Sequence, residues 1–286
     1  MPDATRRDGE LLLVHSSDLH VDDDRIAALH QGDGTGGLRA VLATARALEA
    51  DLVLLAGDTF DNHMVRPATI DRAGRLLAEA GVPIVLLPGN HDPLTADSVY
   101  RRGEFDRIDG LRILGLTDGE VAEFPEYELE IWGRAHRDYI DMAPLGEPRP
   151  RRARRHIAMA HGHYEPPETW ANPLRPSWLI SDAMIAATAA DYVALGHWDR
   201  AAQVGDGSVP AYYSGSPDYV GTVNLVRLTT AGAIAVTLTP TSSRSGSRNS
   251  TGLIASFPGT AGSTTIARIC CGIGSSTRCL ATPLRG

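Results

Sequence analysis

Residues 82–92 read VPIVLLPGNHD, an apolar run that ends in residues suited to a turn and to polar chemistry. A run of this length predicts a buried strand, and the glycine after it predicts a turn. Two earlier runs, Leu11 to Val14 and Leu52 to Ala56, predict strands in the same way. Helical spacing near residues 38–49 and 67–80 separates the three runs, and a proline suited to a first helical turn begins the second helix. This βαβαβ order predicts a parallel sheet with covering helices.

The pattern changes after this unit. Short strands with turns are expected between residues 111 and 132, and a helix is expected near residues 179–189. Further strands are expected near residues 157–160, 192–195, 211–214, 223–228 and 234–238. The order of elements as a whole predicts an α/β fold.

Polar motifs directly follow five of the predicted strands. They are Asp18-Leu19-His20, Gly57-Asp58, Gly89-Asn90-His91-Asp92, His161-Gly162-His163 and Gly196-His197-Trp198-Asp199. Strands that lie side by side bring their carboxyl ends to one edge of a sheet, and ligands of open α/β sheets bind there. Each motif alone is compatible with a turn, where aspartate and asparagine are common. Five in order at strand ends predict instead that these residues converge on one small site.

The ordered motifs resemble the calcineurin-like metallophosphoesterase superfamily, whose pattern is D-x-H, G-D, G-N-H-[DE], a lone histidine and G-H-x-H. The resemblance covers roughly residues 10 to 220. The segments His15 to His20, Gly57 to Asp61 and Tyr213 to Pro217 are similar to the SbcD-type DNA repair exonuclease branch. The resemblance implies a four-layer αββα sandwich of two mixed sheets with helices outside.

The same resemblance implies a dinuclear metal site whose activated hydroxide attacks a phosphoester. Asp58 would bridge the two divalent ions, because a bridging ligand must be anionic and reach both. By resemblance, the ligands of the first ion would be Asp18, His20 and Asp199, and those of the second Asn90, His161 and His197. Oxygen and imidazole donors without thiolate favour Mn²⁺, with Fe or Zn as alternatives.

His91 and Asp92 are expected to act on protons. By resemblance, His91 donates a proton to the leaving alkoxide, a role that the pKa of histidine suits near neutral pH. Asp92 would accept the other ring N–H of His91 and fix its tautomer.

Two of these assignments have an alternative. The family pattern ends its last motif in histidine, and this chain has Asp199 at that position. Asp199 either coordinates the first ion or does not reach it. Coordination by a carboxylate would favour manganese or magnesium at that position. His163 lies two residues after His161 and could take its place, but the family's ligand follows its strand directly, so His161 is favoured.

Other polar residues have ordinary interpretations. His15 is expected to be packed or to support the ligands, and Asp61 to brace the site or cap the next helix. Four histidines are expected at the surface or its boundary: His30, His63, His136 and His156. The arginine-rich stretch at 149–155 is expected to be a solvated loop, with a grip on a polyanion as the alternative.

The charge balance restricts the class of partner. The 286-residue chain has 27 arginines, no lysine and a formal net charge of −8, and residues 1–240 carry 22 arginines against 35 acids. This acidic balance counts against strong binding of duplex DNA, because proteins that hold long nucleic acids carry basic patches. There is no apolar run of about 18 residues and no signal-peptide core, so a cytoplasmic protein without a membrane partner is expected.

The last 46 residues differ in composition. Serine, threonine and glycine occupy 23 of them, no acid is present, and Cys270, Cys271 and Cys279 all lie there. We expect a metallophosphoesterase domain over residues 1–240 and a disordered tail over 241–286, because such a composition buries too little surface to offset the entropy of ordering. A shift of the coding frame near residue 241 is the alternative. The cysteines form neither a zinc motif nor a disulfide framework.

The favoured function is hydrolysis of a phosphoester by a phosphodiesterase or an SbcD-like exonuclease acting on DNA ends, with an ATPase partner in the latter case. The first alternative is a phosphatase or phosphodiesterase for a small nucleotide-like substrate. The second is a non-catalytic interaction protein on the same fold. It ranks last because the chain keeps His91 and, apart from Asp199, every ligand type of the family pattern.

Overall fold

A computed structural model describes residues 9–165, 177–229 and 234–242. Disorder was predicted for residues 241–286. Of these residues, the structure describes only Thr241 and Ser242. Thr241 is buried, and its N–H donates to the carbonyl of Gly221 at 3.0 Å, so ordered packing continues two residues past the predicted domain boundary.

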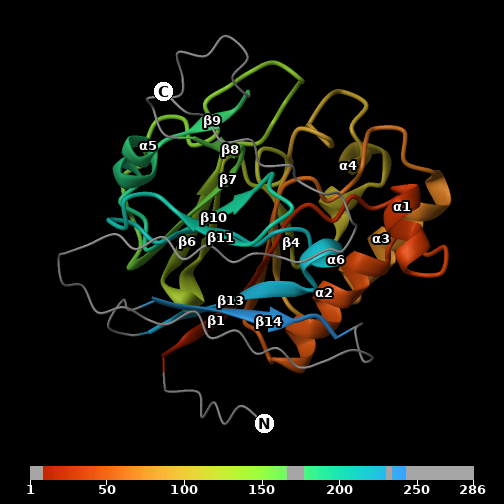
Figure 1. Ribbon diagram of the computed structural model, residues 1–286, viewed down its shortest axis with the longest axis horizontal. Coiled ribbons are helices and arrows are strands. Elements are labelled where there is room, and N and C mark those ends of the chain that lie inside the picture. The colour runs from red at the N-terminus through yellow and green to blue at the C-terminus, as the bar shows by residue number, and fades with distance from the viewer. Residues whose placement is uncertain (1–8, 166–176, 230–233, 243–286) are drawn as a thin grey trace, which may run out of the picture. The chain divides into compact units, whose positions relative to one another are not determined.

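Six strands form the first sheet (Figure 1). In spatial order they are β14 (Ile234–Pro240), β13 (Thr222–Leu228), β1 (Leu11–Ser16), β2 (Leu52–Ala56), β3 (Ile84–Leu87) and β4 (Leu111–Ile113). The run from β1 to β4 is parallel, and β13 and β14 add antiparallel strands to it. The parallel unit predicted for the first ninety residues is confirmed, and β2 has the predicted bounds.

Six more strands form the second sheet. In spatial order they are β11 (Ala202–Val204), β12 (Ala211–Tyr213), β10 (Tyr192–Gly196), β7 (Arg155–His161), β6 (Leu129–Gly133) and β5 (Val121–Phe124). Its four central strands are parallel and its two edge strands antiparallel. A parallel pair, β8 (His163–Tyr164) and β9 (Leu179–Ile180), follows the end of β7.

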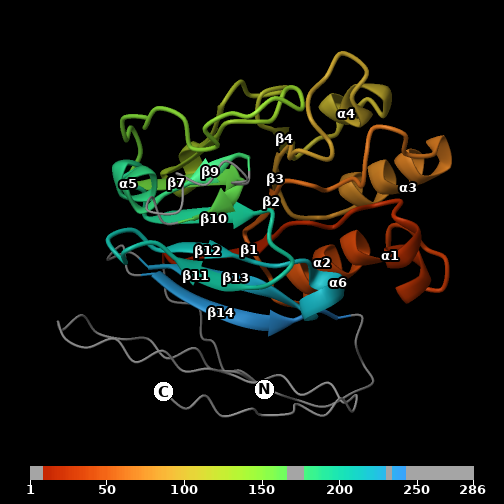
Figure 2. The same cartoon turned by 45° about the horizontal axis from the view of Figure 1, so that its top comes forward.

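Helices cover the sheets from outside. They are α1 (Asp24–Leu29), α2 (Gly36–Ala47), α3 (Pro67–Ala78), α4 (Val99–Arg102), α5 (Asp182–Ala187) and α6 (Pro217–Val220). Figure 2 shows α1, α2 and α3 on one side and α5 on the other, with the strands between them. The α/β architecture of two mixed sheets with outer helices is therefore confirmed. Among the described residues, none of these helices has the length and apolarity needed to cross a membrane.

The central strands are apolar throughout because both of their faces are buried. Tyr192 and Ala194 of β10 join the large core between the sheets, whereas Val193 and Leu195 join a second core with Ile185 of α5. This division explains why the sequence shows continuous apolar runs instead of alternation.

The helix predicted near residues 179–189 is shorter than expected. Leu179 and Ile180 pair with β8, and Ser181 then caps α5, its hydroxyl accepting the backbone N–H of Met184 at 3.3 Å. The residues that suggested a longer helix thus begin with a short strand and a capping serine. Hydrophobic periodicity alone does not distinguish such a short strand from the first turn of a helix.

Candidate metal centre

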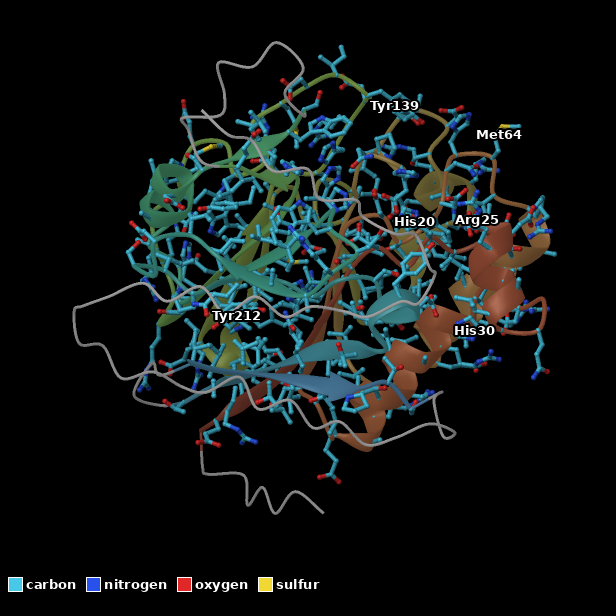
Figure 3. The ribbon with its side chains drawn as sticks, viewed as in Figure 1. His20, Arg25, His30, Met64, Tyr139 and Tyr212 are labelled. Carbon is cyan, nitrogen blue, oxygen red and sulfur yellow. The ribbon has the colours of Figure 1, made fainter. Side chains whose placement is uncertain are left out.

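The polar motifs of both sheets meet at the carboxyl ends of β1, β2, β3, β7 and β10. Two groups of donor atoms form there among the described residues: His20, Asp58 and His91 in one, and Asp58, His161 and His197 in the other. Within each group the donor atoms all lie within 4.8 Å of one another. Asp58 is the member shared by both groups. Figure 3 labels His20, which marks the position of the centre.

The second group is built around the side chain of Asn90. The Nε2 atom of His161 lies 3.1 Å from Asn90 Oδ1 and 3.1 Å from Asp58 Oδ2. The Nδ1 atom of His197 lies 3.1 Å from the same Asn90 oxygen. On its other side, His161 donates Nδ1–H to the carbonyl of Ala56 at 2.9 Å, which leaves Nε2 as the ring atom that could coordinate a metal.

The first group places two imidazoles beside Asp58. The rings of His20 and His91 meet edge to face, with their centroids 4.7 Å apart. The Nδ1 atom of His20 is buried without a hydrogen-bond partner and lies 3.6 Å from Asp61 Oδ1. Asp58 Oδ1 accepts the backbone N–H of His91 at 2.9 Å.

Asp18 joins the two sheets next to both groups. Its two carboxylate oxygens lie 3.1 and 3.0 Å from the backbone nitrogen of His197, which donates to them, and one oxygen accepts the Ser17 hydroxyl at 2.5 Å. The Ser17 hydroxyl also lies 2.9 Å from that of Ser214. Asp18 therefore links the end of β1 to the end of β10.

Four of these residues have a backbone conformation that non-glycine residues rarely adopt. The φ angles are 54° at Asp18, 42° at His20, 50° at Asp58 and 107° at His197. Each such residue costs on the order of 1–3 kcal/mol, and such strain is concentrated at functional sites. Hydrogen bonds between the β1 and β2 loops maintain it, from Asp18 N–H to the Gly57 carbonyl and from His20 N–H to the Asp58 carbonyl, both at 3.1 Å.

Two motif glycines let His161 reach the centre. A Cβ atom at Gly57, which has a φ of 92°, would overlap the His161 ring. A Cβ atom at Gly196 would overlap the carbonyl oxygen of Ala56 and lie 2.8 Å from His161 Nδ1. The ends of β2, β7 and β10 therefore approach one another at a distance that only glycine permits.

Charge is concentrated on Asp58. Burial alone would raise its pKa, but the charge and hydrogen bond of His161, with His91 and His20, bring the pKa below its usual range. Burial would likewise lower the pKa of His161, but Asp58 and Asp18 raise it to about 9. Burial raises the pKa of Asp18 to about 6 against the attraction of His161. Asp58 thus stays ionised and attracts positive charge, as a bridging ligand must.

Contrary to the prediction, Asp92 is not the acceptor for the ring N–H of His91 among the described residues. Its oxygens instead accept the backbone N–H groups of Gly89 at 2.7 Å and Phe60 at 2.9 Å and the hydroxyl of Tyr100 at 2.5 Å. The acceptor for His91 Nδ1–H is the carbonyl oxygen of Asp61, at 2.7 Å. Asp92 therefore holds the loops after β2 and β3 together, and the tautomer of His91 is set by a backbone group.

The two open assignments, Asp199 and His161 or His163, can be compared with the geometry of the described residues. Asp199 is exposed and belongs to neither group, although its neighbour His197 does. His161 lies in the second group, whereas His163 Nδ1 accepts the indole N–H of Trp198 at 3.1 Å.

Two histidines expected near the surface are buried instead. His136 is 1% exposed, and its Nε2–H donates to the carbonyl of His161 at 2.9 Å, so it supports the backbone of His161. His156 accepts the indole N–H of Trp132 at 2.9 Å and donates to Glu130 at 2.7 Å. His136 follows the apolar strand β6, His156 lies near the start of β7, and neither belongs to a recognisable motif. Their burial could therefore not be predicted from the local sequence.

The arginine-rich stretch is occupied with structural contacts. Arg151 pairs with Asp191 at 2.8 Å, Arg154 with Glu128 at 3.4 Å, and Arg149 with Glu120. Arg155 is buried and donates to the carbonyl of Tyr127 at 2.6 Å. These contacts favour the loop interpretation over a grip on a polyanion.

The donor set fits divalent cations. Two imidazole nitrogens converge on one amide oxygen, His20 Nδ1 is buried without a hydrogen bond, and the shared carboxylate is held ionised. Nitrogen and oxygen donors of this kind suit manganese, iron or zinc.

Comparison with known proteins supports the same chemistry. A profile of the family described as "Calcineurin-like phosphoesterase" matches residues 11–200. Among solved structures, the chain is similar to TT1561 of Thermus thermophilus, with a TM-score of 0.52 and 15% identity over 80% of this chain and 98% of that one. It is also similar to a proposed 5'-nucleotidase from Staphylococcus aureus in complex with alpha-ketoglutarate, with a TM-score of 0.56 and 15% identity over 86% of this chain and 56% of that one. At these identities the likeness concerns the fold. The sequence matches none of the curated proteins with which it was compared.

Proposed function

The chain belongs to the calcineurin-like phosphoesterase family, and we propose that it is a dinuclear metal-dependent phosphodiesterase. The observation that carries the proposal is the position of Asp58. It is shared by two donor groups: one contains His20 as the proposed ligand with the proton donor His91 beside it, and the other contains His161 and His197. A single carboxylate between two such groups is the arrangement that a pair of divalent cations requires.

Different residues of the chain would hold the two ions. The residues that would hold one ion are Asp58, Asn90, His161 and His197, and those nearest the other are Asp58, His20 and Asp18. When bound, two such ions neutralise the phosphate oxygens and lower the pKa of a water molecule. Asp18, Asp58 and His161 are buried, and their removal from bulk water strengthens the electrostatic interactions between them.

His91 is the candidate for proton transfer. Its ring is exposed, unlike those of His161 and His136, so it can meet a substrate. Because Nδ1–H donates to the carbonyl of Asp61, Nε2 is the atom that exchanges a proton. A protonated Nε2 would donate to the leaving alkoxide, which is the general-acid step that a poor leaving group needs.

The acidic charge balance of residues 1–240 favours a diester over a monoester as the reacting group. Residues 1–240 carry 22 arginines against 35 acids, and a phosphodiester brings one negative charge where a monoester brings two near neutral pH. A nucleotide-like phosphodiester is therefore the preferred substrate.

An SbcD-like exonuclease with an ATPase partner is the second candidate. Segments similar to that branch come together in the fold, where Ser17 contacts Ser214 at 2.9 Å beside Asp18. This contact supports the candidate because it lies against a proposed ligand.

The test is a hydrolysis screen of the full chain after removal of metals and reconstitution with manganese. Substrates would be bis(p-nitrophenyl) phosphate, p-nitrophenyl phosphate, a cyclic nucleotide, single-stranded DNA and duplex DNA ends, with elemental analysis of the same samples. We expect two ions per chain and turnover of diesters in preference to the monoester. The variant His161→Ala should lose both metal and turnover. Stoichiometry near zero, or activity that survives a chelator, would rule the proposal out.

A further inference from the structure

A stack of three side chains stands next to the metal centre. The indole of Trp198 lies against Tyr213, with ring centroids 4.3 Å apart and planes only 9° from parallel. The guanidinium carbon of Arg200 lies 4.7 Å from the centroid of the same indole. Tyr213 is buried, donates its hydroxyl to the Gly162 carbonyl at 2.6 Å and accepts the Tyr164 N–H at 2.8 Å. The stack is therefore anchored in the second sheet, and Arg200 has a defined position on it.

The same indole fixes the tautomer of His163. The Trp198 N–H donates to His163 Nδ1 at 3.1 Å, and an indole nitrogen can only donate. Neutral His163 must therefore carry its hydrogen on Nε2. Within the described part of the chain, that Nε2–H has no hydrogen-bond acceptor. The ring centroid of His163 lies 6.1 Å from that of His197, so the unused donor stands beside a proposed ligand.

Arg200 differs from three arginines of the segment that precedes β7. Arg149, Arg151 and Arg154 all pair with carboxylates. Arg200 is exposed, follows His197 by three residues, and forms no ion pair with any described residue. A guanidinium held by stacking keeps its planar set of N–H donors available, and that set matches the oxygens of a phosphate.

We propose that His163 and Arg200 form a subsite for a second phosphate group, next to the phosphoester that is cleaved. This inference rests on the proposed function, since it locates the non-reacting part of the same substrate. It identifies the substrate class as a phosphodiester that carries a further phosphate, as a nucleotide chain or a nucleoside bisphosphate does. A neutral N–H donor and an arginine recognise such an anion, and the acidic remainder of the surface does not.

The test compares two chromogenic substrates that differ by one phosphate. They are p-nitrophenyl thymidine 5'-phosphate and the same compound with a 3'-phosphate, both releasing p-nitrophenolate from the manganese-loaded full chain. The measured quantity is the ratio of kcat/KM for the second substrate to that for the first, so general losses of activity cancel. We expect Arg200→Ala to lower this ratio by about tenfold or more through KM, as loss of a charge-assisted hydrogen bond does. Arg200→Lys should give an intermediate ratio, because it keeps the charge and loses the planar fork.

Arg107→Ala is the matched control, since Arg107 is an exposed arginine that pairs with Glu104 at 2.9 Å on the surface. It should leave the ratio unchanged, and elemental analysis should find the same metal content in every variant. An unchanged ratio in Arg200→Ala with hydrolysis intact would overturn the subsite and leave the proposed function standing. No metal-dependent hydrolysis of either substrate by the wild-type chain would overturn the proposed function itself. The second phosphate can come from a nucleotide chain or from a nucleoside bisphosphate. Inhibition of hydrolysis by an oligothymidylate and by thymidine 3',5'-bisphosphate distinguishes these two sources, and the stronger inhibitor identifies the source.

Discussion

The two six-stranded sheets contribute different chemistry to the metal centre. The first sheet supplies the carboxylates, the amide of Asn90 and the imidazoles of His20 and the exposed His91, from the ends of β1, β2 and β3. The second sheet supplies imidazoles only, His161 from β7 and His197 from β10. Because the group of Asp58, His161 and His197 takes members from both sheets, neither sheet alone could supply a metal site of this composition. The difference indicates that metal binding and the packing of the sheets stabilise each other.

Replacing the shared carboxylate should have the largest effect. In Asp58→Asn both sheets keep their other ligands, but the charge between the two groups is lost. Changes to outer-shell partners alone cost about 10–100-fold in metal affinity, so removal of the shared ligand charge should cost at least about 100-fold. Metal titration of the wild type and the variant measures this directly. Unchanged affinity for both ions would remove Asp58 from the bridge.

The variant His91→Ala tests whether His91 of the first sheet acts in proton transfer and not in metal binding. The variant should retain both metals and lose about 10²–10⁴-fold in kcat on esters with poor leaving groups, the usual contribution of general acid catalysis. The loss should be much smaller for a p-nitrophenyl ester, whose leaving oxygen needs little protonation. Turnover of both ester types together with elemental analysis provides the test. Equal losses on the two types, or an emptied metal site, would contradict the assignment.

The variant Gly196→Ala tests whether stability depends on the close approach of the two sheets at Gly196. The added methyl group would overlap the Ala56 carbonyl of the first sheet and press on Ser17, so the free energy of unfolding should fall by about 1–3 kcal/mol. Gly74→Ala is the control, because a Cβ atom there meets Phe105 at an ordinary 3.4 Å and a helix favours alanine. Chemical denaturation of both variants is the measurement. Equal stability would mean that the sheets can separate without cost.

His15 gives the interface between the sheets a pH dependence. It lies on β1 with its Nδ1 atom 2.9 Å from the hydroxyl of Tyr192 on β10, and burial lowers its pKa to about 3. The unfolded chain binds this proton near pH 6.5 and the folded chain does not, so stability falls as pH drops through this window. The slope should be about 1.4 kcal/mol per pH unit steeper in the wild type than in His15→Gln. Denaturation of both proteins between pH 6 and 4.5 in the presence of chelator tests the difference, and parallel slopes would refute it.

Much of the fold could be predicted because both faces of its central strands are buried. The runs at Leu52–Ala56 and Tyr192–Gly196 are apolar throughout for that reason, and their ends were located to within a residue. Motifs at strand ends likewise placed Asp58, Asn90, His161 and His197 correctly beside one another, since parallel strands bring their carboxyl ends to one edge.

Residues that act through distant or backbone contacts could not be predicted in this way. Asp61 serves His91 with its carbonyl oxygen, which every residue type possesses. His136 supports His161 from the loop after β6, without a motif of its own. Asp92 has the expected position in its motif, but the turn after β3 directs it to Gly89, Phe60 and Tyr100.

The sequence by itself determined the order of the main strands and of helices α2 and α3, the strand ends that carry polar residues, and the donor types available for a metal. These follow from local spacing, because apolar periodicity reports burial and glycine reports a turn. Only the tertiary structure decided that Asp199 stays exposed, that His161 and not His163 reaches Asn90, and that Arg200 lies on Trp198. Those outcomes depend on the approach of two sheets and on a backbone angle of 107° at His197, which arise from contacts between residues far apart in the chain.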